Sequence, residues 1–243
     1  MVGGLQYLTL SRPDNAYAVN QVCQYMHNPK TTHLQPVKRI YCYINGTIEH
    51  GLIYRSSPDY TLHAFYDADW AGSLDDRHST SRACIFLGPD ILTWTAKKQS
   101  PISRSSSEAE YRAVATTVAK LQWFRYLFRE LGVPLHTPPC VFVDNISALH
   151  MAANPIFHAR TLHIEIDYHF VSELLAHGVL CSRYVSSQHQ LADIFTKSLS
   201  RERFSFLSGK LNLHLVLFHL SGGEENDNQA KNPTISSQPP ITT

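Results

Sequence analysis

Residues 60–100 carry the alternation of apolar and polar side chains that is typical of strands. One such run, 62–66, leads directly into Asp67, and two further β-rich runs follow at 81–87 and 91–95. A Gly-Pro-Asp turn separates the last two runs and predicts a hairpin. Because the connections are short, we expect three antiparallel strands.

After residue 100 the pattern changes to the spacing of helices and short buried strands. Ser105 or a following serine, with Glu108 and Glu110 in the first turns, begins a long helix that ends before Gly132. The later predicted elements are a strand over 141–143 that ends at Asp144, helices over 145–155 and 163–177, a strand over 178–185 and a short helix over 188–197. This order of elements predicts an α/β fold with a mixed sheet.

Both ends of the chain differ from this region. Residues 1–58 have a mostly helical pattern with a short strand at 52–55, and residues 201–220 form a predicted helical extension. Residues 221–243 contain isoleucine as their only large apolar residue type, so burial cannot offset the entropy of ordering and we expect disorder. The α/β domain itself is predicted over 59–200.

The composition excludes several classes of protein. The net charge is +1, so the strong basic excess of many nucleic-acid-binding proteins is missing, and a polyanion site has to be local or has to recruit cations. The five cysteines are scattered and form no CxxC pair, which suggests neither a disulfide framework nor a zinc site. The N-terminal residues lack a signal-peptide pattern, and the longest apolar run near the C-terminus is too short for a bilayer. We expect a protein of a reducing compartment that is not secreted and has no membrane partner.

Four carboxylates stand where α/β sheets commonly bind ligands, at strand ends and adjoining helix termini. Asp67 and Asp144 follow predicted strands. Glu110 lies in the first turns of the long helix, and Asp193 lies on the last short helix. Converging carboxylates repel one another unless cations neutralise them, and oxygen ligands of this kind suit two Mg²⁺ ions. Two such ions clamp the attacking and leaving oxygens of a phosphoryl displacement. The alternative interpretation is that each Asp caps a turn and that Glu110 complements the helix dipole.

Six segments, in a fixed order, add a family resemblance. They are YDADWAG at 66–72, TWTAKKQ at 93–99, SSSEAEYRA at 105–113, DNISAL at 144–149, HIEIDYHFV at 163–171 and LADIFTK at 191–197. Together they closely resemble the ribonuclease H region of copia-type LTR-retrotransposon Pol polyproteins, and the resemblance runs from about Leu8 to Leu213. Residues 1–58 then correspond to a remnant of the reverse transcriptase connection segment.

The resemblance implies a ribonuclease H-like fold, a mixed five-stranded sheet of three antiparallel and then two parallel strands, flanked by helices. It also implies cleavage of the RNA strand of RNA–DNA hybrids with two divalent ions, Mg²⁺ or Mn²⁺. The catalytic and metal-binding acids of the family correspond to Asp67, Glu110, Asp144 and Asp193. Asp69 is the alternative for the first position, and His189 is a candidate accessory acid or base.

Basic residues give a mixed picture of nucleic-acid binding. Lys97, Lys98 and Arg104 form the densest basic stretch and are candidates for contacts with the phosphates of the hybrid. The alternative is a solvated hairpin edge kept soluble by lysine. Four basic residues usual in the family are replaced here by Cys42, Asn45, Leu162 and Ser172, and a usual glycine is replaced by Arg82.

We therefore expect an endoribonuclease that acts on RNA–DNA hybrids as part of a retrotransposon Pol polyprotein. Its expected partner is the polymerase portion of the same polyprotein, and its expected location is a cytoplasmic virus-like particle or the nucleus. The only adjacent Asp pair, Asp75 and Asp76, lacks the aromatic residue of a polymerase turn, so no polymerase activity is expected. The alternative is a catalytically inactive nucleic-acid-binding relic of a degenerate element, which the lost basic residues favour and the four acids oppose.

Overall fold

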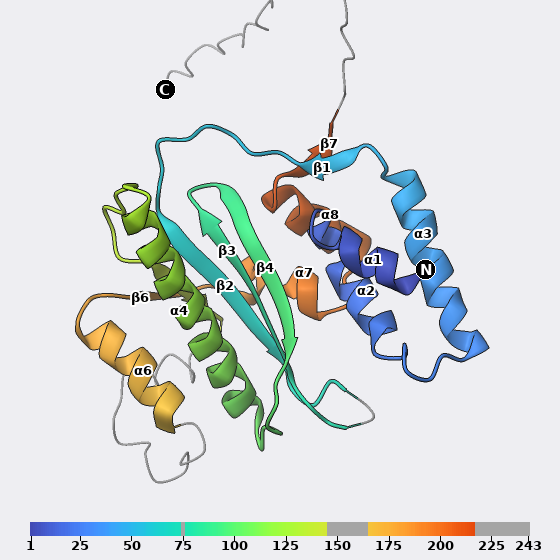
Figure 1. Ribbon diagram of the computed structural model, residues 1–243, viewed down its shortest axis with the longest axis horizontal. Helices are drawn as coiled ribbons and strands as arrows, with labels where there is room; N and C mark the ends of the chain where they lie inside the picture. The colour runs from blue at the N-terminus through green and yellow to red at the C-terminus, as the bar shows by residue number, and fades with distance from the viewer. Residues whose placement is uncertain (74–75, 145–164, 217–243) are drawn as a thin grey trace, which may run out of the picture.

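A five-stranded sheet forms the centre of the chain in a computed structural model that describes residues 1–73, 76–144 and 165–216 (Figure 1). Its strands are β2 (Leu62–Asp69), β3 (Thr80–Leu87), β4 (Asp90–Lys98), β5 (Cys140–Val143) and β6 (Cys181–Tyr184). The spatial order is β4-β3-β2-β5-β6. The pairs β2–β3 and β3–β4 are antiparallel, whereas β2–β5 and β5–β6 are parallel. The predicted mixed sheet of three antiparallel and two parallel strands is confirmed.

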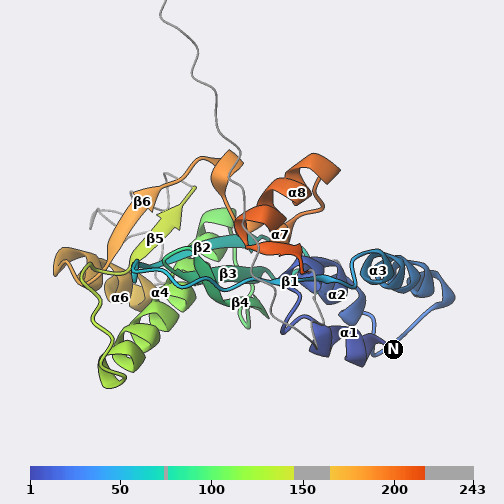
Figure 2. The same ribbon diagram turned by 90° about the horizontal axis from the view of Figure 1, so that it is seen from above.

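Two long helices cover one face of the sheet. Helix α4 (Ser106–Glu130) packs on β2 and β3, and α6 (Glu165–Ala176) packs against α4 (Figure 2). Alternate strand residues such as Tyr66 and Ile85 point to this face and join its apolar core. As predicted, a serine begins the long helix: the Ser105 hydroxyl accepts a hydrogen bond from the backbone N–H of Glu108.

The opposite face of the sheet packs against short C-terminal helices. Phe65 and Phe86, which alternate with the residues of the first face, contact a core that includes Ile194 of α7 (Asp193–Thr196) and Leu207 of α8 (Arg201–Lys210). Ala16 of the N-terminal segment belongs to the same core. The sheet is therefore the middle of three layers.

The N-terminal segment is mostly helical, as its pattern predicts. It contains α1 (Val2–Leu8), α2 (Ala16–Cys23) and α3 (Leu34–Gly46), with 3-10 turns at Pro13–Asn15 and Thr31–His33. These helices have an apolar core of their own around Val19 and Ile40. Figure 1 shows them gathered beside α7 and α8. None of the described helices is long and apolar enough to cross a membrane.

A second, two-stranded sheet joins the N-terminal segment to the C-terminal extension. Strand β1 (His50–Leu52) pairs antiparallel with β7 (Leu213–Leu215). The prediction placed a strand at 52–55 instead, because local alternation cannot show the position of a partner that lies far along the chain. The extension predicted as helical consists, in its described part, of α8 followed by β7.

Three predicted elements differ from the structure or lie outside it. The helix predicted over 188–197 is split into a 3-10 turn at Ser187–His189 and α7, because Gln190 between them has extended backbone angles. The helix predicted over 145–155 and the tail predicted over 221–243 lie outside the described residues, as does Asp75. In its described part, the helix predicted over 163–177 is α6.

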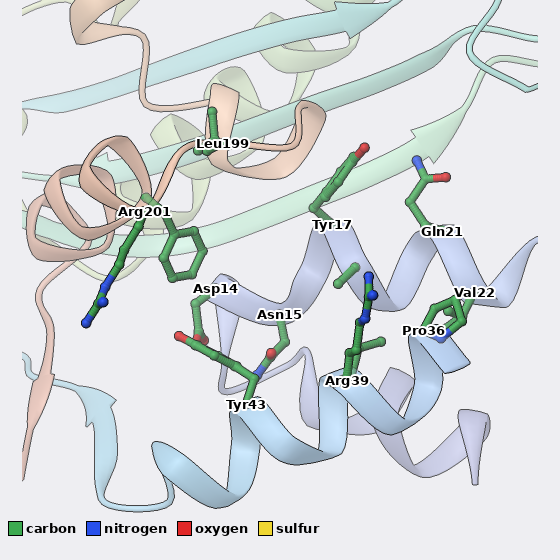
Figure 3. Close-up of a pocket in the computed structure, with 13 residues that line it drawn as sticks. Asp14, Asn15, Tyr17, Gln21, Val22, Pro36, Arg39, Tyr43, Leu199 and Arg201 are labelled. Atoms are coloured by element: carbon green, nitrogen blue, oxygen red, sulfur yellow. The ribbon is translucent and has the colours of Figure 1, made fainter. Parts of the chain in front are cut away.

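An apolar hollow of about 550 Å³ lies between α2, α3 and the start of α8 (Figure 3). Tyr17, Tyr43 and Phe204 contribute aromatic rings to its wall. Tyr43 reaches from α3 towards Asp14, to which its hydroxyl donates a hydrogen bond of 2.8 Å. The four candidate carboxylates do not line this hollow.

Candidate active site

Asp67 and Asp144 lie at the same edge of the sheet. The parallel strands β2 and β5 are register partners from His63 and Cys140 to Phe65 and Phe142, so the residues that follow lie side by side. Burial raises the pKa of the Asp144 carboxyl, and the charge of Asp67 raises it further. The nearby Gln190 side chain and the Lys197 ammonium act in the opposite direction. The two acids are thus close enough to interact electrostatically.

Asp193 reaches this edge from the first residue of α7. It is buried, and its Oδ1 lies 2.7 Å from the Nζ of Lys197, one helical turn later. The same Nζ lies 3.4 Å from Oδ2 of Asp67. Burial lowers the pKa of the Lys197 ammonium, but the hydrogen bond to Asp193 and the charges of Asp67, Asp193 and Asp144 outweigh this and raise it. One ammonium group therefore interacts with three of the four predicted acids.

Glu110 approaches from the other side of the sheet, in the first turns of α4. Glu110 and the other acids act electrostatically on one common residue, Tyr66, which is fully buried next to Asp67 in β2. Burial raises the pKa of the Tyr66 hydroxyl well above its usual value, and the charges of Glu110, Asp144 and Asp67 add to this effect. Tyr66 thus lies within the electrostatic reach of three predicted acids.

Asp69 and His189 lie at the margins of the cluster. Burial raises the pKa of Asp69, which Arg82 lowers and Asp67 raises. Its carboxylate packs so closely on Gly72 that a Cβ there would lie 2.0 Å from Oδ2. His189 is exposed on its own 3-10 turn, with Nδ1 2.9 Å from the Ser186 hydroxyl, and does not share a helix with Asp193. The expectation that they lie on one helix is wrong.

The basic stretch is divided between two places. Lys97 and Lys98 end β4 and line a small polar pocket of about 180 Å³ that Arg112 of α4 also lines. Lys98 is ion-paired with Asp76. Arg104 is exposed on the connection before α4 and does not line this pocket.

The donor set fits hard divalent cations. Carboxylate oxygens are the ligands that Mg²⁺ and Mn²⁺ prefer. Oδ2 of Asp67 is buried and accepts no hydrogen bond from the described residues, so a buried acceptor faces the cluster. Within the described ranges, no three His, Cys, Asp or Glu side chains are already arranged to hold a metal ion. The Lys197 ammonium lies between Asp67 and Asp193, at the position where these carboxylates would bind a divalent metal ion.

Sequence reasoning missed three residues of this site. Lys197 ends the LADIFTK motif and has no predicted role, although its i, i+4 spacing from Asp193 is a signal for an ion pair on a helix. Arg203 of α8 lies 3.7 Å from Oδ2 of Asp193. Gln190 is fully buried near Asp144, and no sequence signal indicated it.

Together, the mixed sheet in the order β4-β3-β2-β5-β6, the helices on its two faces and the acids at its edge define a ribonuclease H-like fold. Comparisons with known proteins add the family. The chain is 46% identical over 216 residues to the retrovirus-related Pol polyprotein from transposon RE1 of Arabidopsis thaliana, which covers 89% of this chain and 15% of that protein. It is 33% identical over 215 residues to the corresponding polyprotein from transposon TNT 1-94 of Nicotiana tabacum, covering 88% of this chain and 16% of that protein.

The chain belongs to the family of retrovirus-related Pol polyproteins from transposons, of which it matches one segment. It spans only about a seventh of the length of these curated relatives. No family model matches the chain. Among solved structures, LC11-RNase H1 in complex with an RNA/DNA hybrid aligns with a TM-score of 0.41 at 10% identity, over 54% of this chain and 88% of that chain.

Proposed function

We propose that the chain is the ribonuclease H part of a copia-type transposon Pol polyprotein and cleaves the RNA strand of RNA–DNA hybrids. The observation that carries this proposal is the convergence of Asp67, Asp144 and Asp193 on one ammonium group, with Glu110 close to Tyr66 beside them. Two divalent ions bound by these acids would supply an activated water and neutralise the charge that develops on the scissile phosphate.

The chain's own residues hold and orient this site. Asp67 lies within β2 and Asp144 directly follows β5, whereas α4 and α7 bring in Glu110 and Asp193. Lys97, at the exposed end of β4, is available to a phosphate of the bound hybrid. The 2′-hydroxyl groups and groove shape of the hybrid, rather than its base sequence, would select the substrate. Within this proposal, the partner is the polymerase portion of the polyprotein, in a cytoplasmic particle or the nucleus.

The direct test is cleavage of a 5′-labelled RNA strand in an RNA–DNA hybrid with Mg²⁺ or Mn²⁺. We expect cleavage that requires the metal and disappears in Asp144→Asn. The matched control is Glu173→Gln, which neutralises an exposed acid on α6 and should leave cleavage unchanged. Single-stranded RNA and duplex DNA should not be cut.

The same experiment separates this proposal from the inactive alternative. Hybrid binding by a folded protein without cleavage in either metal would identify a nucleic-acid-binding relic. The ion pairs that Lys197 and Arg203 already make with Asp193 favour this second candidate, because they compete with a metal ion.

A further inference from the structure

The Lys197 side chain lies at the centre of the acid cluster. Its Nζ is 2.7 Å from Asp193 Oδ1 and 3.4 Å from Asp67 Oδ2, although about half of the side chain is exposed. The two carboxylates are only 9% and 10% exposed, so most of their other approaches are covered by protein. A cation that enters from solvent therefore meets these oxygens at the position that the ammonium holds.

We propose, resting on the proposed function, that Lys197 is an internal competitor for the divalent metal, which must displace its ammonium from Asp67 and Asp193 to bind. With no metal bound, the ammonium neutralises acids that would otherwise repel one another and so stabilises the fold. When metal binds, the half-exposed side chain swings into solvent, because among the described residues the ion-pair partners of its Nζ are the two carboxylates that the metal takes. Lys197 thus sets the metal concentration at which the acids bind the metal ion.

Calorimetric titration of Mn²⁺ into the intact chain tests this without measuring activity. Lys197→Met keeps the length of the side chain but removes the charge, and should bind Mn²⁺ about three- to tenfold more tightly than the wild type. Lys38→Met, an exposed lysine on α3, is the matched control and should not change the affinity. Equal affinities in Lys197→Met and wild type would overturn the inference. If the wild type itself binds no Mn²⁺, the metal-dependent function fails as well.

A second readout uses the unmodified chain, so it does not depend on the folding of a variant. Reaction with an amine-specific acylating reagent, followed by mass spectrometry of peptides, reports how accessible each lysine is. Saturating Mn²⁺ should increase acylation of Lys197 severalfold and leave Lys38 unchanged. Unchanged acylation of Lys197 in a chain that binds Mn²⁺ would contradict displacement and leave the proposed function intact.

A separate observation concerns two cysteines that face each other on neighbouring strands. Cys140 and Cys181 are register partners in the parallel pair β5–β6, and their Sγ atoms are 2.7 Å apart. Neighbouring strands are about 4.8 Å apart, which falls inside the Cα separation that a disulfide can span. The remaining cysteines, at positions 23, 42 and 84, lie on α2, on α3 and inside β3.

We infer that Cys140 and Cys181 form a disulfide when the chain meets a small-molecule disulfide such as oxidised glutathione. The Cys181 thiol, which is partly exposed, attacks the small disulfide as its thiolate and releases one reduced thiol. Cys140 then attacks the mixed disulfide, releases the second reduced thiol and completes the Cys140–Cys181 bond. Two protons leave the protein thiols, and two electrons pass to the reagent. The bond would tie the edge strand β6 to β5.

Intact-mass measurement after exposure to oxidised glutathione tests this inference. We expect a loss equal to two hydrogen atoms, a peptide that links Cys140 with Cys181, and a melting temperature raised by several degrees. Cys42→Ser, at an exposed cysteine, should show the same loss, and Cys181→Ser should not. A stable glutathione adduct on Cys181 of the wild type, without the cross-link, would overturn the inference.

Discussion

Arg82 and Asp67 are direct cross-strand partners in the antiparallel pair β2–β3, so both side chains emerge on the sheet face that α7 covers. Arg82 is 1% exposed, and its Nη1 donates a 3.1 Å hydrogen bond to the Thr196 carbonyl. Its guanidinium lies 5.5 Å from the centre of the Tyr17 ring. Arg82 stands where the family usually has glycine. Its buried guanidinium thus connects Tyr17 of the N-terminal helices with Thr196 of α7 beside the site.

We expect Arg82→Met to lower the free energy of unfolding by about 1–3 kcal/mol, because the Thr196 carbonyl loses its donor and Asp67 loses a nearby positive charge. Thermal and urea unfolding measure this change. Tyr17→Leu, which removes only the ring contact, should cost less. Equal stability of Arg82→Met and wild type would show that the buried guanidinium contributes nothing net.

Asp144→Asn should stabilise the fold at neutral pH while it abolishes cleavage. Burial and the charge of Asp67 raise the pKa of the folded-state Asp144 carboxyl. The protonated Asp144 carboxyl therefore makes its full contribution to the stability of the fold below the unfolded-state pKa of about 4. This contribution is lost as the pH rises through the higher folded-state pKa. An amide stays neutral at all these pH values, so the melting temperature of the variant should exceed that of the wild type at pH 7. The difference should vanish near pH 3, and a difference that grows towards low pH would reverse the sign of this argument.

Asp14→Asn should destabilise the N-terminal segment by about 3–5 kcal/mol, the usual cost of breaking a buried ion pair. Arg12 donates to both oxygens of Asp14, at 3.0 and 2.7 Å, and the two side chains are 7% and 0% exposed. Tyr43 adds a third donor to the same carboxylate. Removing the charge leaves the Arg12 guanidinium buried without its counterion. Hydrogen exchange should show the loss first in α2 and α3, and unchanged protection there would contradict this assignment.

Lys97→Ala should weaken binding to an RNA–DNA hybrid. The slope of the logarithm of the binding constant against the logarithm of the salt concentration should become shallower by about one, as for one lost phosphate contact. Lys98→Ala should have a smaller effect, because Asp76 already neutralises Lys98. Fluorescence anisotropy across a series of salt concentrations measures both. Lys38→Ala is the control, and equal slopes for Lys97→Ala and wild type would place the hybrid elsewhere.

The elements that sequence predicts well are those whose pattern is local. The alternation around β2, β3 and β4 and the serine cap of α4 depend only on neighbouring residues, and the structure has all four elements. Strand β1 was misplaced because its position depends on β7, a partner that the local pattern does not show.

The candidate site divides in the same way. Each carboxylate could be located from its position after a strand or within a helix. Lys197 carries a local signal, its i, i+4 spacing from Asp193, whereas Arg203 could not be assigned to Asp193, because that contact depends on how α7 and α8 pack under the sheet. Arg82 differs in sequence from the glycine usual in the family, and nothing in the sequence indicates that it is buried.

The pairing of β1 with β7 ties together the segments that precede and follow the α/β domain. Ala16 from the N-terminal helices and Leu207 from the C-terminal extension share one apolar layer with Phe65 of β2. The apolar contacts that stabilise the sheet therefore come from all three predicted regions, on both sides of the boundaries that the sequence suggests at 58 and 200. Heating should melt the N-terminal helices, the sheet and the extension in a single cooperative transition, because all three contribute side chains to this shared apolar layer.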